Sequence, residues 1–448
     1  MDSRVIFSII AALLSLINIA IIMRFRKGLL SSFGVSGMLI LVLLLWKQIA
    51  YFFSVNIFDF FNSYHYWKIY SISGEHFVYI YVFELVANLT FLTVLVSKQV
   101  QFERLPKIKV TSEQISILLL LLLTFNIGRF AETYSFGRIT NPLGILSSFS
   151  TYLLQPVSVI SLYYIKRFSR LQSVIVAITF ISTLISINTR GYVVYGILVL
   201  LSMYLFANFS KIKLLLFRSI IIVPLLLLIF KGVPQISYSI DKSETSNRGN
   251  LSLELYDNNA KSAGRELLDE LDFRFGMMPR MSSKFIFMSS QYGHVGLSPV
   301  FHSLVGFIPR SLWPNKPVPS TDTGLDINDQ AMYRIYRESL GRDTTSMVEF
   351  SVPGHYFWEL HIIGVVLFSI FSAIYTKTIL AIFKGEILGI SVLLTTMKPW
   401  GFMDPKIWMS DIPLQVYQVF IPLFLILLLF RIVGVINASL KQVIFNHE

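Results

Sequence analysis

Residues 5–27 read VIFSIIAALLSLINIAIIMRFRK, an apolar run of 19 residues closed by three basic side chains. A helix of this length can cross the hydrocarbon core of a bilayer, which is about 30 Å thick. The run is longer than the apolar core of a signal peptide, and no small-x-small cleavage site follows it. We therefore expect a retained first transmembrane helix, with Arg24, Arg26 and Lys27 on the cytoplasmic side.

The same pattern recurs along the chain, which has 448 residues, of which 54% are hydrophobic and only 14% charged. An ordinary soluble domain has about 25% charged residues. The sequence therefore predicts an all-α polytopic membrane protein with about eleven transmembrane helices. The predicted spans are residues 5–23, 35–53, 77–96, 114–128, 146–165, 173–188, 192–208, 214–230, 357–376, 386–397 and 412–430.

One large polar loop divides the predicted spans into two groups. Residues 1–230 hold the first eight helices, residues 231–356 form the loop, and residues 357–448 hold the last three helices. Between Lys231 and Glu349 there are 13 basic and 14 acidic residues, whereas the whole chain has a net charge of +12. The positive excess thus lies in the short loops between spans, which predicts that the large loop faces away from the cytoplasm.

Composition also excludes several kinds of chemistry. The chain has no cysteine, which rules out disulfides, thiolate nucleophiles and cysteine-based metal sites. The sequence contains no phosphate-loop motif, dinucleotide fingerprint or HExxH pair. We therefore expect no cofactor and no metal. No basic patch stands apart from the membrane segments, so we expect no nucleic-acid partner.

The most specific stretch is FIPRSLWPNKP at residues 307–317. Three prolines fix the backbone around Arg310, Trp313 and Lys316. A tryptophan suits the membrane interface or a platform on which a sugar stacks, and the two cations suit a diphosphate. The alternative reading of the stretch is a turn at the membrane interface.

Four further arginines are candidates for the same role. Arg190 lies between two predicted spans at the outer surface, where lipid phosphates lie. The alternative is that Arg190 is an ordinary charged residue in a turn between two helices. Arg265, Arg274 and Arg280 lie on a stretch of helical spacing, residues 262–292. Their acidic neighbours make a solvated, salt-bridged helix face the alternative.

Ionisable residues also gather where the loop re-enters the membrane, namely His355, Glu359 and His361. Such groups are costly inside an apolar helix, so they are functional candidates. We expect Glu359 in the first turns of the helix, where it could act as a general base. The alternative is a structural carboxylate that the positive end of the helix dipole stabilises.

The stretch at residues 308–317 resembles the Pro-Arg-x-Leu-Trp-Pro-x-Lys-Pro segment of the oligosaccharide repeat unit polymerases, the Wzy-type O-antigen polymerases. The order of elements over residues 180–375 is similar too: an Arg-Gly turn at 190–191, Arg274 in the outer loop, and a Pro-Gly pair followed by Glu359. In the segment around the glutamate the family often shows Gly-Glu-x-Tyr-x-Asn-Phe-Gly, whereas residues 358–364 of this chain read WELHIIG.

The resemblance implies a GT-C-like glycosyltransferase in the bacterial cytoplasmic membrane. Such an enzyme joins oligosaccharide repeat units, carried on undecaprenyl diphosphate, into O-antigen, capsule or exopolysaccharide at the outer face. It implies catalytic roles for Glu359, Arg310, Arg274 and Arg190. Substrate-binding roles go to Lys316, Trp313, Arg265, Arg280 and His355. It also implies membrane lipids and a chain-length regulator protein as partners.

Two other functions fit the same residues. A ligase that moves finished glycan from the same lipid to another acceptor would need the same groups. A flippase or other transporter belongs to a different class, and would be expected to show repeated halves and binding residues near the midplane of the membrane. The sequence shows no such halves.

Overall fold

A computed structural model describes residues 3–56, 74–97, 116–121, 123–124, 168–186, 352–382 and 404–406, together with the single positions 282, 286, 294, 296, 297, 300, 304, 412, 424, 428, 431 and 432. All of the secondary structure in these parts is helical. The main elements are α1 (Ser3–Asn56), α3 (Gly74–Val96), α6 (Arg170–Ser186) and α13 (Val352–Ile382).

Three of these helices are long and apolar enough to cross a membrane. The apolar stretches are Ile6–Ile49 in α1, Val78–Val96 in α3 and Val352–Ala381 in α13. A shorter apolar helix covers Arg170–Thr179. The structure confirms apolar helices at the predicted spans 5–23, 35–53, 77–96 and 357–376, all within the described residues. The predicted spans at 146–165, 192–208, 214–230 and 386–397 lie outside them.

Helix α1 is two helices joined by a sharp reversal. Gly34 has φ 56° and ψ −123°, a conformation that a residue with a Cβ atom adopts only with strain. Gly37 then packs so closely on the backbone of Leu29 that a Cβ atom there would overlap the Leu29 carbonyl. The helix therefore continues beyond the expected end of the first span at residue 23, and the chain turns back at Gly34.

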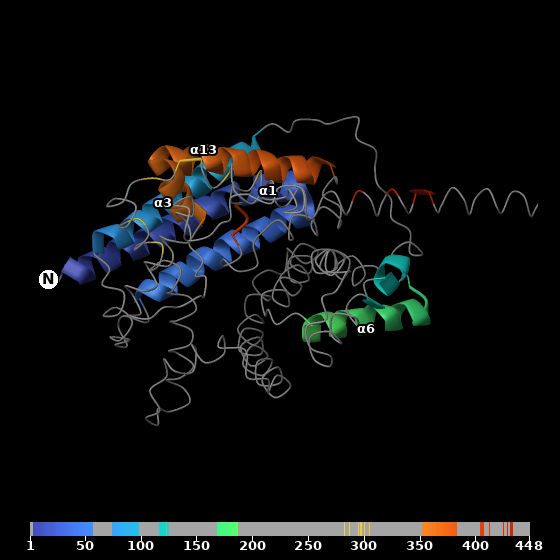
Figure 1. The fold of residues 1–448 in the computed structure, drawn as a ribbon. Helices are drawn as coiled ribbons and strands as arrows, with labels where there is room; N and C mark the ends of the chain where they lie inside the picture. The colour runs from blue at the N-terminus through green and yellow to red at the C-terminus, as the bar shows by residue number, and fades with distance from the viewer. Residues whose placement is uncertain are drawn as a thin grey trace, which may run out of the picture.

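Contacts with α3 confirm this hairpin. Asn18 and Lys47 would lie about 44 Å apart in a straight helix. Yet Asn18 bonds Asn88 and Lys47 pairs with Glu84, and these two partners are one turn apart on α3. The two halves of α1 therefore run side by side against α3, as the two blue rods of Figure 1 show.

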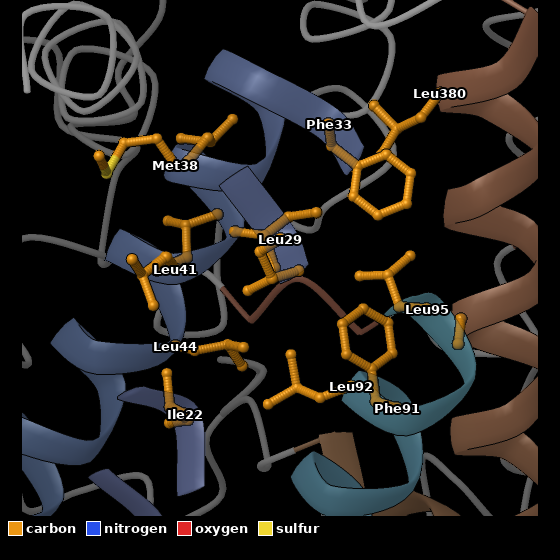
Figure 2. Packing of buried hydrophobic residues seen from close by; sticks show 14 residues of the cluster. Ile22, Leu29, Phe33, Met38, Leu41, Leu44, Phe91, Leu92, Leu95 and Leu380 are labelled. Atoms are coloured by element: carbon orange, nitrogen blue, oxygen red, sulfur yellow. The ribbon is translucent and has the colours of Figure 1, made fainter. Parts of the chain in front are cut away.

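At the end of the bundle where α1 turns, apolar side chains from three helices form a core (Figure 2). Phe33 and Leu29 of α1 lie close to Leu95 of α3 and Leu380 of α13. Lys377 of α13 donates a hydrogen bond to the Ser97 carbonyl oxygen at 2.8 Å. We call this end the turn end. Arg24, Arg26 and Lys27, predicted to be cytoplasmic, thus lie at the same end of the bundle as Lys377.

A second core lies at the opposite end, which we call the site end. It joins Tyr51 of α1, Tyr81 and Phe83 of α3, and Tyr356 and Phe357 of α13. The Phe83 and Phe357 rings stack with centroids 4.5 Å apart. Ile286 and Val300, from the predicted outer loop, pack on the same core. The site end is therefore where loop and bundle meet.

Candidate functional site

Helix α13 begins with a short segment that folds back on the rest of the helix. Its helical backbone breaks at Leu360 (φ −136°, ψ 31°) and His361 (φ 58°, ψ −156°). Gly364 packs on Tyr356, so that a Cβ atom at residue 364 would overlap the Tyr356 carbonyl. This geometry repeats the α1 reversal, because in each case a residue of positive φ precedes a closely packed glycine by three positions. We call residues 352–364 the site hairpin.

The local sequence explains where this hairpin starts. Pro353 occupies the first turn of the segment, where its fixed φ fits a helix and its missing N–H removes no helical bond. The helix therefore starts at Val352, five residues before the start that hydropathy predicts. Glu359 is consequently the eighth residue, at the carboxyl end of the short segment. A helix dipole is negative there, so the stabilisation expected for a carboxylate in the first turns does not apply.

The side chains of Glu359 and His355 lie close together inside the site hairpin. The His355 Nδ1 atom lies 3.3 Å from Glu359 Oε1, as expected for residues one helical turn apart. Glu359 is fully buried and His355 is 3% exposed. The Trp358 ring lies edge-on to His355, with centroids 5.6 Å apart. An acidic and a basic side chain are thus held side by side, away from water.

Two residues of the predicted outer loop close the end of the short segment. Gly296 donates its backbone N–H to the Glu359 carbonyl at 2.8 Å. The His294 Nδ1 atom lies 3.0 Å from the Phe357 carbonyl oxygen and 3.3 Å from that of Trp358. These bonds satisfy carbonyl groups that a helix end otherwise leaves without partners. The loop is thus fixed to the hairpin at the position of Glu359.

His361 completes a group of histidines at the site end. Its ring lies edge-on to the His294 ring, with centroids 5.0 Å apart. Both imidazoles are exposed, in contrast to His355. A positive φ is rare for a residue with a Cβ atom, and the strain costs on the order of 1–3 kcal/mol. Strain of this size is typical of functional sites, where surrounding contacts hold it in place.

Next to the hairpin, two lysines and two carboxylates form a buried cluster that we call the ionic quartet. Lys47 of α1 pairs with Glu84 of α3 and with Asp404. Lys406 pairs with Asp404 at 2.8 Å and approaches Glu84 at 3.7 Å. All four side chains are buried, and their formal charges cancel. The quartet therefore ties residues 404–406, which lie between the predicted spans 386–397 and 412–430, to α1 and α3.

Polar side chains extend the quartet along the bundle. Lys406 donates to the Asn88 side-chain oxygen at 2.7 Å, and Asn88 donates to Asn18 at 3.1 Å. The Tyr51 hydroxyl lies 3.4 Å from Glu84 Oε1. Hydropathy did not single out these residues, because one charge hardly changes the mean of a long apolar run. The signal that could have found them is the presence of Lys47 and Glu84 inside predicted spans.

Of the residues predicted to carry the function, the structure brings together His355 and Glu359. The other predicted site residues lie outside the described part of the chain, namely Arg190, Arg265, Arg274, Arg280, Arg310, Trp313 and Lys316. Their roles stay predictions. Within the described residues, no group of three or more His, Asp or Glu side chains could hold a metal ion.

Comparison with known proteins gives one match. Residues 35–346 match the model of a family described as a domain of unknown function, DUF8712. No curated protein and no solved structure shows a significant match. The match covers α3 and α6 and most of the predicted outer loop, and it ends before the site hairpin.

Proposed function

The chain belongs to the DUF8712 family, and from its own residues we propose that it is a membrane glycosyltransferase that polymerises lipid-linked oligosaccharides. The proposed substrates are repeat units carried on undecaprenyl diphosphate at the outer face of the bacterial cytoplasmic membrane. The observation that carries the proposal is the buried Glu359–His355 pair, held in a strained hairpin against the predicted outer loop. An acid–base pair at the boundary between bundle and loop suits a reaction between two membrane-anchored sugars.

The arrangement of charge supports an outward-facing site. Arg24, Arg26 and Lys27 lie in α1 before its reversal, and Lys377 bonds Ser97, the residue after α3, at the same end of the bundle. Basic residues of this kind lie on the cytoplasmic side of most membrane proteins. The site end is opposite, so it faces outward in the proposed topology of about eleven spans with a GT-C-like arrangement.

The proposed reaction needs two kinds of group. The acceptor hydroxyl must lose a proton as its oxygen attacks the anomeric carbon of the donor sugar. The lipid diphosphate then leaves, and fixed cations stabilise its charge. Arg190, Arg274, Arg310 and Lys316 are the proposed cations, with Arg265, Arg280 and Trp313 beside them for diphosphate and sugar. The diphosphate is itself a good leaving group, so the proposal calls for no nucleotide and no metal.

A ligase would use the same donor and the same groups, so the two transferases differ in their acceptor. A flippase is the candidate of another class, and one observation favours it. Lys47 and Glu84 are charged residues inside membrane-spanning helices, as in many transport pathways. However, the quartet is electrically neutral and closed, and Lys47 is close to the outer end of its apolar stretch, Ile6–Ile49. These features favour a structural cluster over a midplane substrate site.

Deletion of the gene, followed by gel electrophoresis of the surface glycan, separates the three functions. A polymerase defect leaves glycan of a single repeat unit. A ligase defect leaves the lipid core without glycan while long polymer accumulates on the carrier lipid. A flippase defect leaves single units on the cytoplasmic face, out of reach of enzymes added from outside.

The same strain tests Glu359. A plasmid carrying Glu359→Gln should fail to restore long glycan although the protein reaches the membrane in normal amount, because the change removes the acidic side chain next to His355. A full glycan ladder from this variant would show that the pair has no part in the reaction.

A further inference from the structure

The group that takes the proton from the acceptor must reach the surface, and Glu359 does not. A general base has to come within about 2.6–3.2 Å of the hydroxyl, or act through one water molecule. The Glu359 carboxylate is fully buried and paired with His355, which is buried as well. A sugar hydroxyl that arrives from outside the membrane therefore meets an exposed histidine of the site end before it meets Glu359.

His294 is exposed and is held in one orientation. Its Nδ1 atom faces the carbonyl oxygens of Phe357 and Trp358, at 3.0 and 3.3 Å. Carbonyl oxygens only accept hydrogen bonds, so Nδ1 must carry a proton. In the neutral imidazole the other nitrogen, Nε2, then has a free lone pair and can accept a proton. Among the described residues, none forms a hydrogen bond with Nε2.

The surroundings of His294 fit the proposed substrates. Leu297, three residues after His294, exposes 41% of its surface, and Ile362 and Ile363, which follow His361, expose 36% and 62%. Exposed apolar side chains beside a polar site suit the boundary between lipid and water, where a carrier lipid presents its sugars. The carbonyl end of the short helix also favours the positive charge that the imidazole gains in the transition state.

On these grounds, and on the basis of the proposed function, we propose that His294 is the general base of the glycosyl transfer. The acceptor O–H bond breaks and its proton moves to Nε2 of His294, while the acceptor oxygen forms the new bond to the anomeric carbon. The bond from that carbon to the diphosphate oxygen breaks, and its electron pair leaves with the lipid diphosphate. The Glu359–His355 pair acts as a positioning element that fixes the carbonyl groups to which His294 is bonded.

The neighbouring His361 is the competing candidate for the base. It is also exposed, and its ring is 5.0 Å from the ring of His294. No described residue forms a hydrogen bond with its imidazole, so no described residue fixes one tautomer. Replacement by asparagine, a residue that accepts positive φ more readily than most, should keep the backbone turn at this position.

The test uses the full-length protein in proteoliposomes, with single repeat units on the carrier lipid extracted from cells that lack the gene. Release of lipid diphosphate and growth of the glycan are followed together. In His294→Asn the side-chain amide can still donate to the helix carbonyls but cannot act as a base. We expect kcat to fall by about 100-fold or more with KM nearly unchanged, and His361→Asn to lose activity by a much smaller factor.

A second variant separates loss of the base from loss of folding. In His294→Ala, added imidazole should restore part of the activity, because a free base can enter the space that the side chain leaves. Wild-type rates in His294→Asn, or a folded His294→Ala that imidazole does not rescue, would overturn the assignment of the base. Absence of transfer by the wild-type protein would instead overturn the proposed function itself.

Discussion

At the residue scale, the stability of the bundle depends on buried charges that lie next to charges of opposite sign. Moving a charge out of water costs several kcal/mol, and an opposite charge at close range offsets that cost. Lys47 contacts both carboxylates of the ionic quartet and lies over the Tyr51 ring at 5.5 Å. Removal of this one cation would leave two carboxylates facing a single remaining lysine, Lys406.

Lys47→Met should therefore lower the stability of the protein strongly. Removal of one partner of a buried ion pair typically costs about 3–5 kcal/mol. The measurement is the thermal unfolding midpoint of the purified protein in detergent, compared with that of Lys27→Met. Lys27 is an exposed residue of the same helix, so its replacement should change the midpoint little. Equal midpoints for the two variants would contradict the proposed role of the quartet.

At the element scale, two hairpins shape the described bundle. Both reversals need a residue at positive φ followed by a glycine on which the preceding turn packs closely. Gly37 and Gly28 allow a direct comparison, because an added Cβ atom would meet the Leu29 backbone in the first case and only the Val96 side chain in the second. A backbone carbonyl cannot move aside without opening the hairpin, whereas a side chain can rotate.

Gly37→Ala should consequently destabilise the protein more than Gly28→Ala does. Strain and overpacking of this kind cost about 1–3 kcal/mol. Thermal unfolding in detergent gives the two midpoints side by side. A larger loss for Gly28→Ala would show that the packing of α1 on α3 limits stability more than the turn does.

Some of these elements could be predicted from the sequence and others could not. Apolar length predicted the helices at residues 5–23, 35–53 and 77–96 correctly, because the requirement to span a bilayer is a property of each segment alone. The start of α13 and its reversal at His361 were not predicted, since a positive φ at histidine depends on contacts made by the surrounding structure.

The candidate site was predicted only in part. The cost of burying charge pointed to Glu359 and His355, and the structure pairs them. The bonds from His294 and Gly296 to the end of the hairpin join residues more than 60 positions apart, so no local pattern reveals them. The same holds for Asp404 and Lys406, whose partners are in α1 and α3.

At the scale of the whole molecule, the proposed function requires the two ends of the bundle to face opposite sides of the membrane. Arg26 and Lys27 lie at the turn end, whereas the segment around Leu297 is bonded to the site hairpin. A transferase that uses undecaprenyl-linked sugars at the outer face must expose its site end to the outside. The orientation of the chain is thus the claim on which the proposed function, the cations and the base all depend.

The absence of cysteine allows this claim to be tested directly. Single cysteines at the exposed positions Lys27 and Leu297 can be labelled in intact cells with a maleimide that does not cross membranes. The account predicts labelling at residue 297 in intact cells, and labelling at residue 27 only after the membrane is permeabilised. Labelling of residue 27 in intact cells, with residue 297 protected until permeabilisation, would place the site in the cytoplasm and contradict the account.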